Sequence, residues 1–254
     1  MSRLSVILIT RNEVENLAEC LETVRWADEI VVVDSGSDDG TQAIARRYTD
    51  KLYETHDWPG FGIQKNRALA HARGDWVLSL DADERVTPAL RAAIQQAITE
   101  GRHRVYRMPR QSWFLGRRMR HGGWSPDFVT RLFRRGAARF SDDLVHERLL
   151  HDDPAGTLDA PLLHFSYRDL EQVLEKINRY SSAGAANMLA KGRRGGLGRA
   201  LGHGLWSFLQ TWLLRRGFLD GREGLILAIA NAQGAYYRYL KLKYLDEQRQ
   251  TPGD

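Results

Sequence analysis

The chain has 254 residues, of which 43% are hydrophobic and 27% charged, with a formal net charge of +5 and a single cysteine. This length suits one large domain or a domain with an appendage, and the composition excludes a disordered, collagen-like or disulfide-stapled protein. Cys20 has no partner for an internal disulfide, and residues 1–11 lack the pattern of a secretory leader, so we expect a cytoplasmic protein.

The net charge conceals four regions of alternating sign. The net charges are −6 for residues 1–101, +10 for 102–139, −5 for 140–190 and +6 for 191–254. All eleven cations of the second region are arginines, whose planar side chains pair well with phosphates and carboxylates. This region is either a solvated basic face or a surface for an anionic ligand. A nucleic acid partner is not expected, because no recognition motif accompanies the arginines.

The first hundred residues alternate strand and helix patterns. Runs of apolar residues predict buried strands, and apolar residues at helical spacing predict the helices between them. The expected strands cover residues 4–9, 30–33, 52–53 and 76–80, and the expected helices cover 16–25, a segment beginning at Thr41, 61–73 and 87–100. This alternation predicts the α/β class, with a doubly wound, mostly parallel sheet that helices cover on both faces.

The pattern changes after residue 101. Strand-like segments at 105–108 and 128–133 are separated by glycines and a proline, which indicates mixed or antiparallel additions to the sheet. Residues 168–191 have apolar side chains at helical spacing. We therefore expect one domain over residues 1–165 and a helical C-terminal region over residues 166–254.

Two uncharged stretches lie in the C-terminal region, at residues 200–214 and 224–237. Both are shorter than the roughly 20 residues of a membrane-spanning helix, so we expect no such helix. The first stretch is rich in leucine and tryptophan and is flanked by arginines, which is typical of a helix at a membrane interface. The alternative is a helix that packs on the domain or in a homodimer contact.

Polar residues follow three of the predicted strands, at 10–13, 34–41 and 81–83. The carboxyl ends of parallel strands meet at one edge of the sheet, where ligands bind. A dinucleotide-binding domain would need glycines after the first strand, and none are present, so a nicotinamide-dependent oxidoreductase is disfavoured. Asp81 and Asp83 instead suggest a site for a divalent cation and a diphosphate, because two neighbouring carboxylates repel unless a cation joins them.

Four ordered segments resemble the successive motifs of the family 2 inverting glycosyltransferases, which have the A-type fold. They are residues 6–13 (VILITRNE), 31–41 (VVVDSGSDDGT), 64–69 (QKNRAL) and 74–84 (GDWVLSLDADE). Over nearly its whole length, including residues 145–149 (VHERL) and 217–221 (GFLDG), the chain is similar to the bacterial lipopolysaccharide inner-core β-glucosyltransferases of that family. One departure is Ser35, where many relatives have a second acidic residue.

The resemblance implies a nucleotide-diphospho-sugar transferase fold in which residues 1–101 bind the nucleotide sugar and residues 102–165 bind the acceptor. It also implies that Thr10, Glu13 and Asp34 contact the uridine of the donor. Lys65 or Arg67 would lie near the same nucleotide.

The resemblance assigns Asp81 and Asp83 to the ribose, the diphosphate and a Mg²⁺ or Mn²⁺ ion. His164 lies in an apolar stretch, where a histidine is either a further metal ligand beside Asp83 or a satisfied core residue. A metal that bridges Asp83 and the diphosphate would neutralise the charge that develops on the leaving nucleotide.

Inversion requires a base that takes the proton of the acceptor hydroxyl. Glu147 matches the acid of the family's His-Glu motif and is our candidate, with Asp127, Asp142 and Asp143 as competitors. The alternative for Glu147 is a plain ion pair with Arg148 or another neighbour, and His146 is expected to be structural.

Two residues of the arginine-rich region are candidates for acceptor binding. Trp124 lies between glycines and a proline, where its ring could stack on a sugar, and Arg131 could bind an acceptor phosphate or acidic sugar. Core packing is the ordinary alternative for a tryptophan.

Together these residues predict a metal-dependent inverting glycosyltransferase. We expect it to transfer a sugar, most simply glucose from UDP-glucose, to a lipid-linked lipopolysaccharide inner-core acceptor, while bound peripherally to the cytoplasmic face of the inner membrane. The alternatives are a glycosyltransferase of capsule, exopolysaccharide or polyprenyl-linked sugar synthesis, and a non-catalytic nucleotide-binding scaffold at a membrane.

Overall fold

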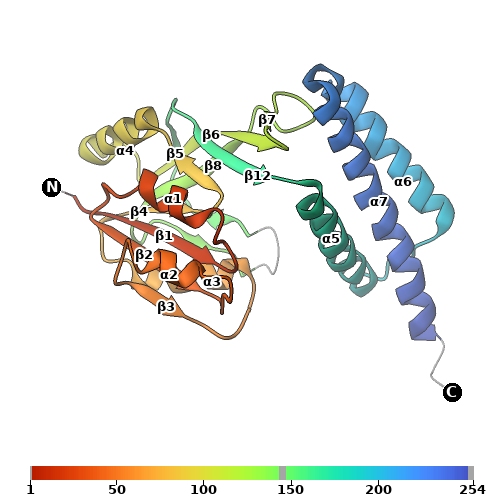
Figure 1. Cartoon of the computed structure of the whole chain (residues 1–254), viewed down its shortest axis with the longest axis horizontal. Helices are drawn as coiled ribbons and strands as arrows, with labels where there is room; N and C mark the ends of the chain where they lie inside the picture. Colours follow the sequence, from red (N-terminus) through yellow and green to blue (C-terminus); the bar gives the residue numbers. More distant parts are fainter. Residues whose placement is uncertain (1, 143–146, 251–254) are drawn as a thin grey trace. The chain divides into compact units, whose positions relative to one another are not determined.

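The structure is a computed structural model that describes residues 2–142 and 147–250 of the chain (Figure 1). The chain divides into two compact units, one formed by residues 1–111 and 127–164 and the other by residues 112–126 and 165–254. The second unit begins near the domain boundary expected from the sequence, but it also contains residues 112–126. They belong there because Phe114 and Met119 are buried in one apolar cluster with Val173 and Leu227 of the C-terminal helices.

The first strands of the chain form the parallel part of a ten-stranded sheet. They lie in the order β3-β2-β1-β4, and their bounds are β1 Leu4–Thr10, β2 Glu29–Asp34, β3 Leu52–Glu54 and β4 Trp76–Leu80. Every residue of β1, β2 and β4 is buried, which explains their continuous apolar runs. In the register, Thr10 of β1 lies beside Asp34 of β2, so the polar ends of these strands come together as predicted.

The rest of the sheet is mainly antiparallel. After β4 the order continues β8-β6-β12-β5, with bounds β5 Glu84–Val86, β6 Val105–Phe114, β8 Phe128–Arg134 and β12 Leu162–Tyr167. The short strands β7 Arg117–Arg118 and β11 Gly156–Thr157 pair with β6, and β9 Arg139–Phe140 pairs with β10 Leu149–Leu150. β5 and β12 are elements that the sequence patterns did not predict.

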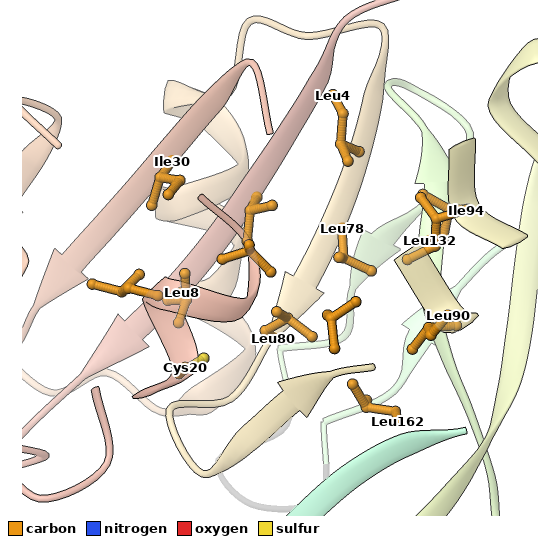
Figure 2. Close-up of a cluster of buried hydrophobic side chains, with 14 of the residues drawn as sticks. Leu4, Leu8, Cys20, Ile30, Leu78, Leu80, Leu90, Ile94, Leu132 and Leu162 are labelled. Carbon is orange, nitrogen blue, oxygen red and sulfur yellow. The ribbon is translucent and has the colours of Figure 1, made fainter. Parts of the chain in front are cut away.

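Helices cover both faces of the sheet. α1 (Leu17–Thr23), α2 (Thr41–Ala45) and α4 (Pro88–Glu100) pack on the face formed by the even-numbered residues of β1, and Figure 2 shows this core around Leu8, Leu78 and Leu90. α3 (Phe61–His71) packs on the opposite face, against the odd-numbered residues of β1. This alternation follows from the two-residue period of a strand, and it confirms the predicted doubly wound α/β fold.

The second unit is built on three long helices. They are α5 (Leu170–Ala190), α6 (Leu197–Leu209) and α7 (Gly221–Gln250), and α7 lies between the other two (Figure 1). A π-helical turn at Gln210–Leu214 continues α6, and a 3-10 turn at Gly217–Asp220 precedes α7. Within the residues described, no helix is long and apolar enough to cross a membrane.

Buried Asp220 connects the start of α7 to the segment 112–126. Its carboxylate accepts hydrogen bonds from the backbone amides of Arg120 and His121, the latter at 2.7 Å, and it pairs with the His121 ring at 3.1 Å. The 217–221 motif therefore has a structural role, because it ties these two parts of the second unit together.

Candidate active site

Asp34 organises the loop that follows β2. Its carboxylate accepts four hydrogen bonds, from Thr10 Oγ1 at 2.8 Å, from the amide and hydroxyl of Ser37 at 2.8 and 2.6 Å, and from Gln42 Nε2 at 2.9 Å. Burial by itself would raise the pKa of Asp34, but these hydrogen bonds outweigh burial and lower it. Asp34 is thus an ionised, buried carboxylate whose oxygens are already engaged by the protein, and it holds residues 37–42 beside the end of β1.

Glu13 follows β1 and faces the aspartates that follow β4. Burial raises the pKa of Glu13, and the negative charges of Asp83 and Asp81 add to that effect, whereas a 2.8 Å hydrogen bond from Asn16 opposes it. The carboxyl ends of β1 and β4 therefore gather acidic groups at one edge of the sheet, which is where a cationic ligand would be stabilised.

Two cations hold Asp81. Lys65 Nζ lies 2.8 Å from Asp81 Oδ1, and Arg131 Nη2 donates to Asp81 Oδ2. Arg131 also donates to Glu84 Oε1 at 2.8 Å, and Glu84 is completely buried. Burial opposes ionisation of Asp81, but the charges of Arg131 and Lys65 hold its pKa well below the usual range. The result is an ionised Asp81 fixed at both oxygens.

Arg131 lies in a different setting from the one expected for an acceptor-binding residue. It lies on β8 in the first unit and is only 8% exposed, and its guanidinium pairs with Asp81 and Glu84. Burial raises the pKa of Glu84. Glu84 was missed by sequence reasoning, although its place directly after Asp81-Ala82-Asp83 was the available signal.

Lys65 connects Asp81, at the edge of the sheet, to Glu147, the candidate base. Its side chain is 3% exposed, and its Nζ lies 2.7 Å from Glu147 Oε1 as well as 2.8 Å from Asp81 Oδ1. Glu147 is 17% exposed, so its carboxylate is held by Lys65 but still reaches solvent. One buried cation thus brings together two carboxylates that are 66 residues apart in the chain.

α3 fixes the segment that carries Glu147. Asn66 Nδ2 donates to the Phe140 carbonyl and the Phe140 amide donates to Asn66 Oδ1, both at 2.9 Å. A Cβ atom on Gly62 would lie 1.7 Å from the Ser141 carbonyl oxygen, so only glycine permits this approach of the chain to α3. Asn66 and Gly62 were not singled out in the sequence, and their only signal was their position in or beside the 64–69 motif.

Arg67 lies on another side of α3. It forms two 2.7 Å hydrogen bonds with Asp57, and it donates to Gln64 Oε1 at 3.0 Å. Buried Gln64 in turn donates to Ser35 Oγ at 2.9 Å, which links the 64–69 motif to the loop after β2. Of the two candidate cations, the structure brings Lys65 and not Arg67 to Asp81.

Asp83 and His164 form a separate pair. Asp83 Oδ2 lies 3.2 Å from His164 Nε2, where β12 pairs with β5, and both side chains are partly exposed. Among residues 2–142 and 147–250 there is no cluster of three or more metal-ligating side chains.

The other candidates lie elsewhere. Asp127 pairs with Arg110 at 2.8 Å, and Asp142 is exposed. Asp143 and His146 lie outside the described residues. Trp124 belongs to the second unit, where it is half-buried and packs edge-on against Phe114 with ring centroids 5.7 Å apart.

The sequence model of the family described as "Glycosyl transferase family 2" matches residues 5–155, which includes the strand-end carboxylates, the 64–69 motif and Glu147. The chain belongs to glycosyl transferase family 2. It is a glycosyltransferase with the A-type fold. This confirms the family and fold that the four motifs predicted.

The chain is similar to other proteins over nearly its whole length. The lipopolysaccharide core biosynthesis glycosyltransferase LpsC of Rhizobium meliloti is 30% identical, over 93% of this chain and 93% of its own length. The uncharacterized glycosyltransferase RP128 of Rickettsia prowazekii is 28% identical, over 99% of this chain and 90% of its own length. Among solved structures, TarS of S. aureus in complex with UDP is 16% identical, with a TM-score of 0.49 over 97% of this chain and 92% of that chain.

Proposed function

We propose that this glycosyltransferase is a metal-dependent inverting enzyme that uses a UDP-sugar, most simply UDP-glucose, and acts on a lipopolysaccharide inner-core acceptor. The acceptor class is supported by similarity to LpsC over nearly the full length of both chains. Such an acceptor is lipid-linked, so we propose further that the enzyme works at the surface of an anionic membrane.

The observation that carries the proposed mechanism is the position of Lys65 between Asp81 and Glu147. A general base must lie within reach of the acceptor hydroxyl while the sugar is held at the donor site. Because one ammonium group contacts both carboxylates, Glu147 lies at the edge of the sheet where the family binds its donor. Asp127, the competing acid directly before β8, is instead paired with Arg110.

Asp83 and His164 fit a Mg²⁺ or Mn²⁺ ion. They offer one carboxylate oxygen and one imidazole nitrogen 3.2 Å apart, both partly exposed, and Mn²⁺ accepts both ligand types. Hydrated divalent cations commonly bind through one or two carboxylates together with substrate phosphates. The bound metal would neutralise negative charge on the leaving nucleoside diphosphate.

The remaining steps fall to groups of the chain itself. Glu147 accepts the proton of the attacking acceptor hydroxyl, and Lys65 keeps its carboxylate directed toward the donor. Arg131 and Lys65 fix Asp81 in its ionised form, so that it can accept hydrogen bonds from the donor. Asp34 shapes the loop that follows β2, and Thr10 and Glu13 complete the nucleoside side of the site.

Two variants test the assignment of roles. Glu147→Gln should bind the donor and metal as the native protein does but transfer no sugar, and Asp83→Ala should lose the stabilisation that Mn²⁺ adds to donor binding. The measurements are thermal shifts with UDP-, GDP-, ADP- and CMP-sugars, with and without Mn²⁺, followed by transfer assays. Undiminished transfer by Glu147→Gln would rule out Glu147 as the base, and equal stabilisation by all four nucleotides would argue against a UDP-specific donor site.

A further inference from the structure

A basic pocket lies in the second unit, where α5, α6 and α7 meet. It has a volume of about 450 Å³ and is lined by Met188, Gly192, Arg193, Arg194, Arg199, His203 and Tyr239. The His203 ring stacks on the Tyr239 ring at 4.0 Å between centroids, which forms a flat wall beside the arginines. All three arginines are exposed. Three guanidinium groups around one concave surface are suited to a phosphate group.

An exposed apolar stripe begins beside this pocket and runs along α6 into the π-helical turn. α6 turns Ala200 and Gly204 toward α7, and a Cβ on Gly204 would lie 3.3 Å from Tyr236. α6 and the π-helical turn also carry large apolar side chains, each between 51% and 66% exposed. These residues, here called the α6 stripe, are Leu197, Leu201, Leu205, Trp206, Leu213 and Leu214.

The charges around the α6 stripe are all of one sign. Residues 191–219 contain Lys191 and five arginines but no aspartate or glutamate. The arginines lie at both ends of the stripe, with the pocket at its start and Arg215 and Arg216 at its end. This pattern matches an anionic lipid surface, in which the apolar side chains of the α6 stripe would contact acyl chains and the arginines at its ends would contact headgroup phosphates.

A second copy of the chain matches this surface poorly. A two-fold contact places the same surface of both copies together, so it would bring two sets of these arginines together. The segment has no carboxylate of its own that could pair with them. The charge pattern therefore favours a lipid bilayer over a homodimer as the occupant.

We propose that the α6 stripe inserts into an anionic bilayer while the pocket formed by Arg193, Arg194, Arg199 and His203 binds the phosphate of one lipid headgroup. The helix lies in the plane of the interface, and Arg215 and Arg216 contact further headgroups at its other end. This inference rests on the proposed function only in that a lipid-linked acceptor requires the enzyme at a membrane. It adds the surface and the headgroup site by which the enzyme binds there.

Vesicle sedimentation tests the headgroup pocket. The full-length protein should bind vesicles of phosphatidylcholine with phosphatidylglycerol and not vesicles of phosphatidylcholine alone. Each basic residue near an anionic surface contributes about fivefold to partitioning, so a variant with Ala at 193, 194 and 199 should bind about 100-fold more weakly. A matched control replaces three exposed arginines of the first unit, Arg25, Arg47 and Arg134, with Ala and should bind like the native protein. Equal losses of vesicle binding in both triple variants would overturn the proposal that the pocket binds a headgroup, because they would show only an effect of net charge.

A second variant tests the stripe. Leu197→Gln, Leu201→Gln and Leu205→Gln together should abolish sedimentation with anionic vesicles while the melting temperature stays within a few degrees, because these side chains are exposed in the free protein. The shift of tryptophan emission on vesicle addition should diminish in Trp206→Phe. If the native protein is instead a stable dimer that the Gln variant converts to a monomer, and neither binds vesicles, the α6 stripe is a subunit contact and the proposal is wrong.

Transfer to a water-soluble, deacylated acceptor separates this inference from the proposed function. The triple arginine variant should transfer sugar to that acceptor at the native rate. If the native protein transfers sugar to this acceptor but does not bind anionic vesicles, the membrane site is overturned and the enzyme's function stays intact. Vesicle binding without donor binding or transfer would overturn the proposed function and leave the membrane site.

Discussion

Replacement of Arg131 by methionine should destabilise the protein strongly. The substitution keeps an apolar stem of similar length on β8 but removes the guanidinium that bonds Asp81 and Glu84. Glu84 is completely buried, and its nearest remaining cation would be Arg110, whose Nη1 lies 3.7 Å away. Asp81 would keep Lys65 at 2.8 Å. The main consequence is a buried Glu84 carboxyl without its partner.

The magnitude follows from the cost of breaking a buried ion pair. Removing one partner costs about 3–5 kcal/mol, and the nearby Arg110 places the expected loss at the lower end, about 3 kcal/mol. For a chain of this size each kcal/mol lowers the melting temperature by about 2–4 °C, so Arg131→Met should melt about 6–12 °C below the native protein.

A double-mutant cycle measures the coupling. Guanidinium denaturation of Arg131→Met, Glu84→Gln and the double variant should show that the double variant is more stable than the sum of the two losses predicts, by about 1–3 kcal/mol. Arg134→Met, an exposed arginine on the same strand, is the matched control and should change stability by less than about 0.5 kcal/mol. Additive losses, or a loss below about 1 kcal/mol in Arg131→Met, would show that the buried pair does not stabilise this edge of the sheet.

Three further outcomes are expected. Lys65→Met should lower kcat for sugar transfer by about 10- to 100-fold with a smaller change in donor affinity, because Glu147 loses the cation that directs it; calorimetric donor titration and initial rates separate the two. Asn66→Ala should lower stability by about 2 kcal/mol, since it removes two hydrogen bonds to the backbone beside Glu147, and a thermal melt would show this. Burial by itself would raise the pKa of Glu29, but hydrogen bonds from a backbone amide and from Lys51 lower it to about 2. Above pH 4.5 Glu29 therefore contributes about 3 kcal/mol to the free energy of unfolding, and this contribution is lost as the pH falls toward 2. Melting temperatures of the native protein and Glu29→Gln should converge over that range; curves that stay parallel would contradict this.

Short-range patterns in the sequence were sufficient for much of the fold. Strand and helix periodicities are local, so the parallel strands, the helices between them and the long C-terminal helices could be predicted from residue spacing. The strand-end positions of Asp34, Asp81 and Asp83 followed from the same patterns. Membership of glycosyl transferase family 2 followed from the order of the motifs, and the family match confirms it.

Only the tertiary structure decided which side chains meet. Lys65 was one of two cations in its motif, and the packing of α3 against β1, β2 and β9 brings it to both Asp81 and Glu147. Arg131 was one of eleven similar arginines, and the pairing of β8 with β4 buries it between two carboxylates. Lys65 and Glu147 are 82 residues apart in the chain and Arg131 and Asp81 are 50 apart, and such contacts depend on strand order and register, which local residue preferences do not encode.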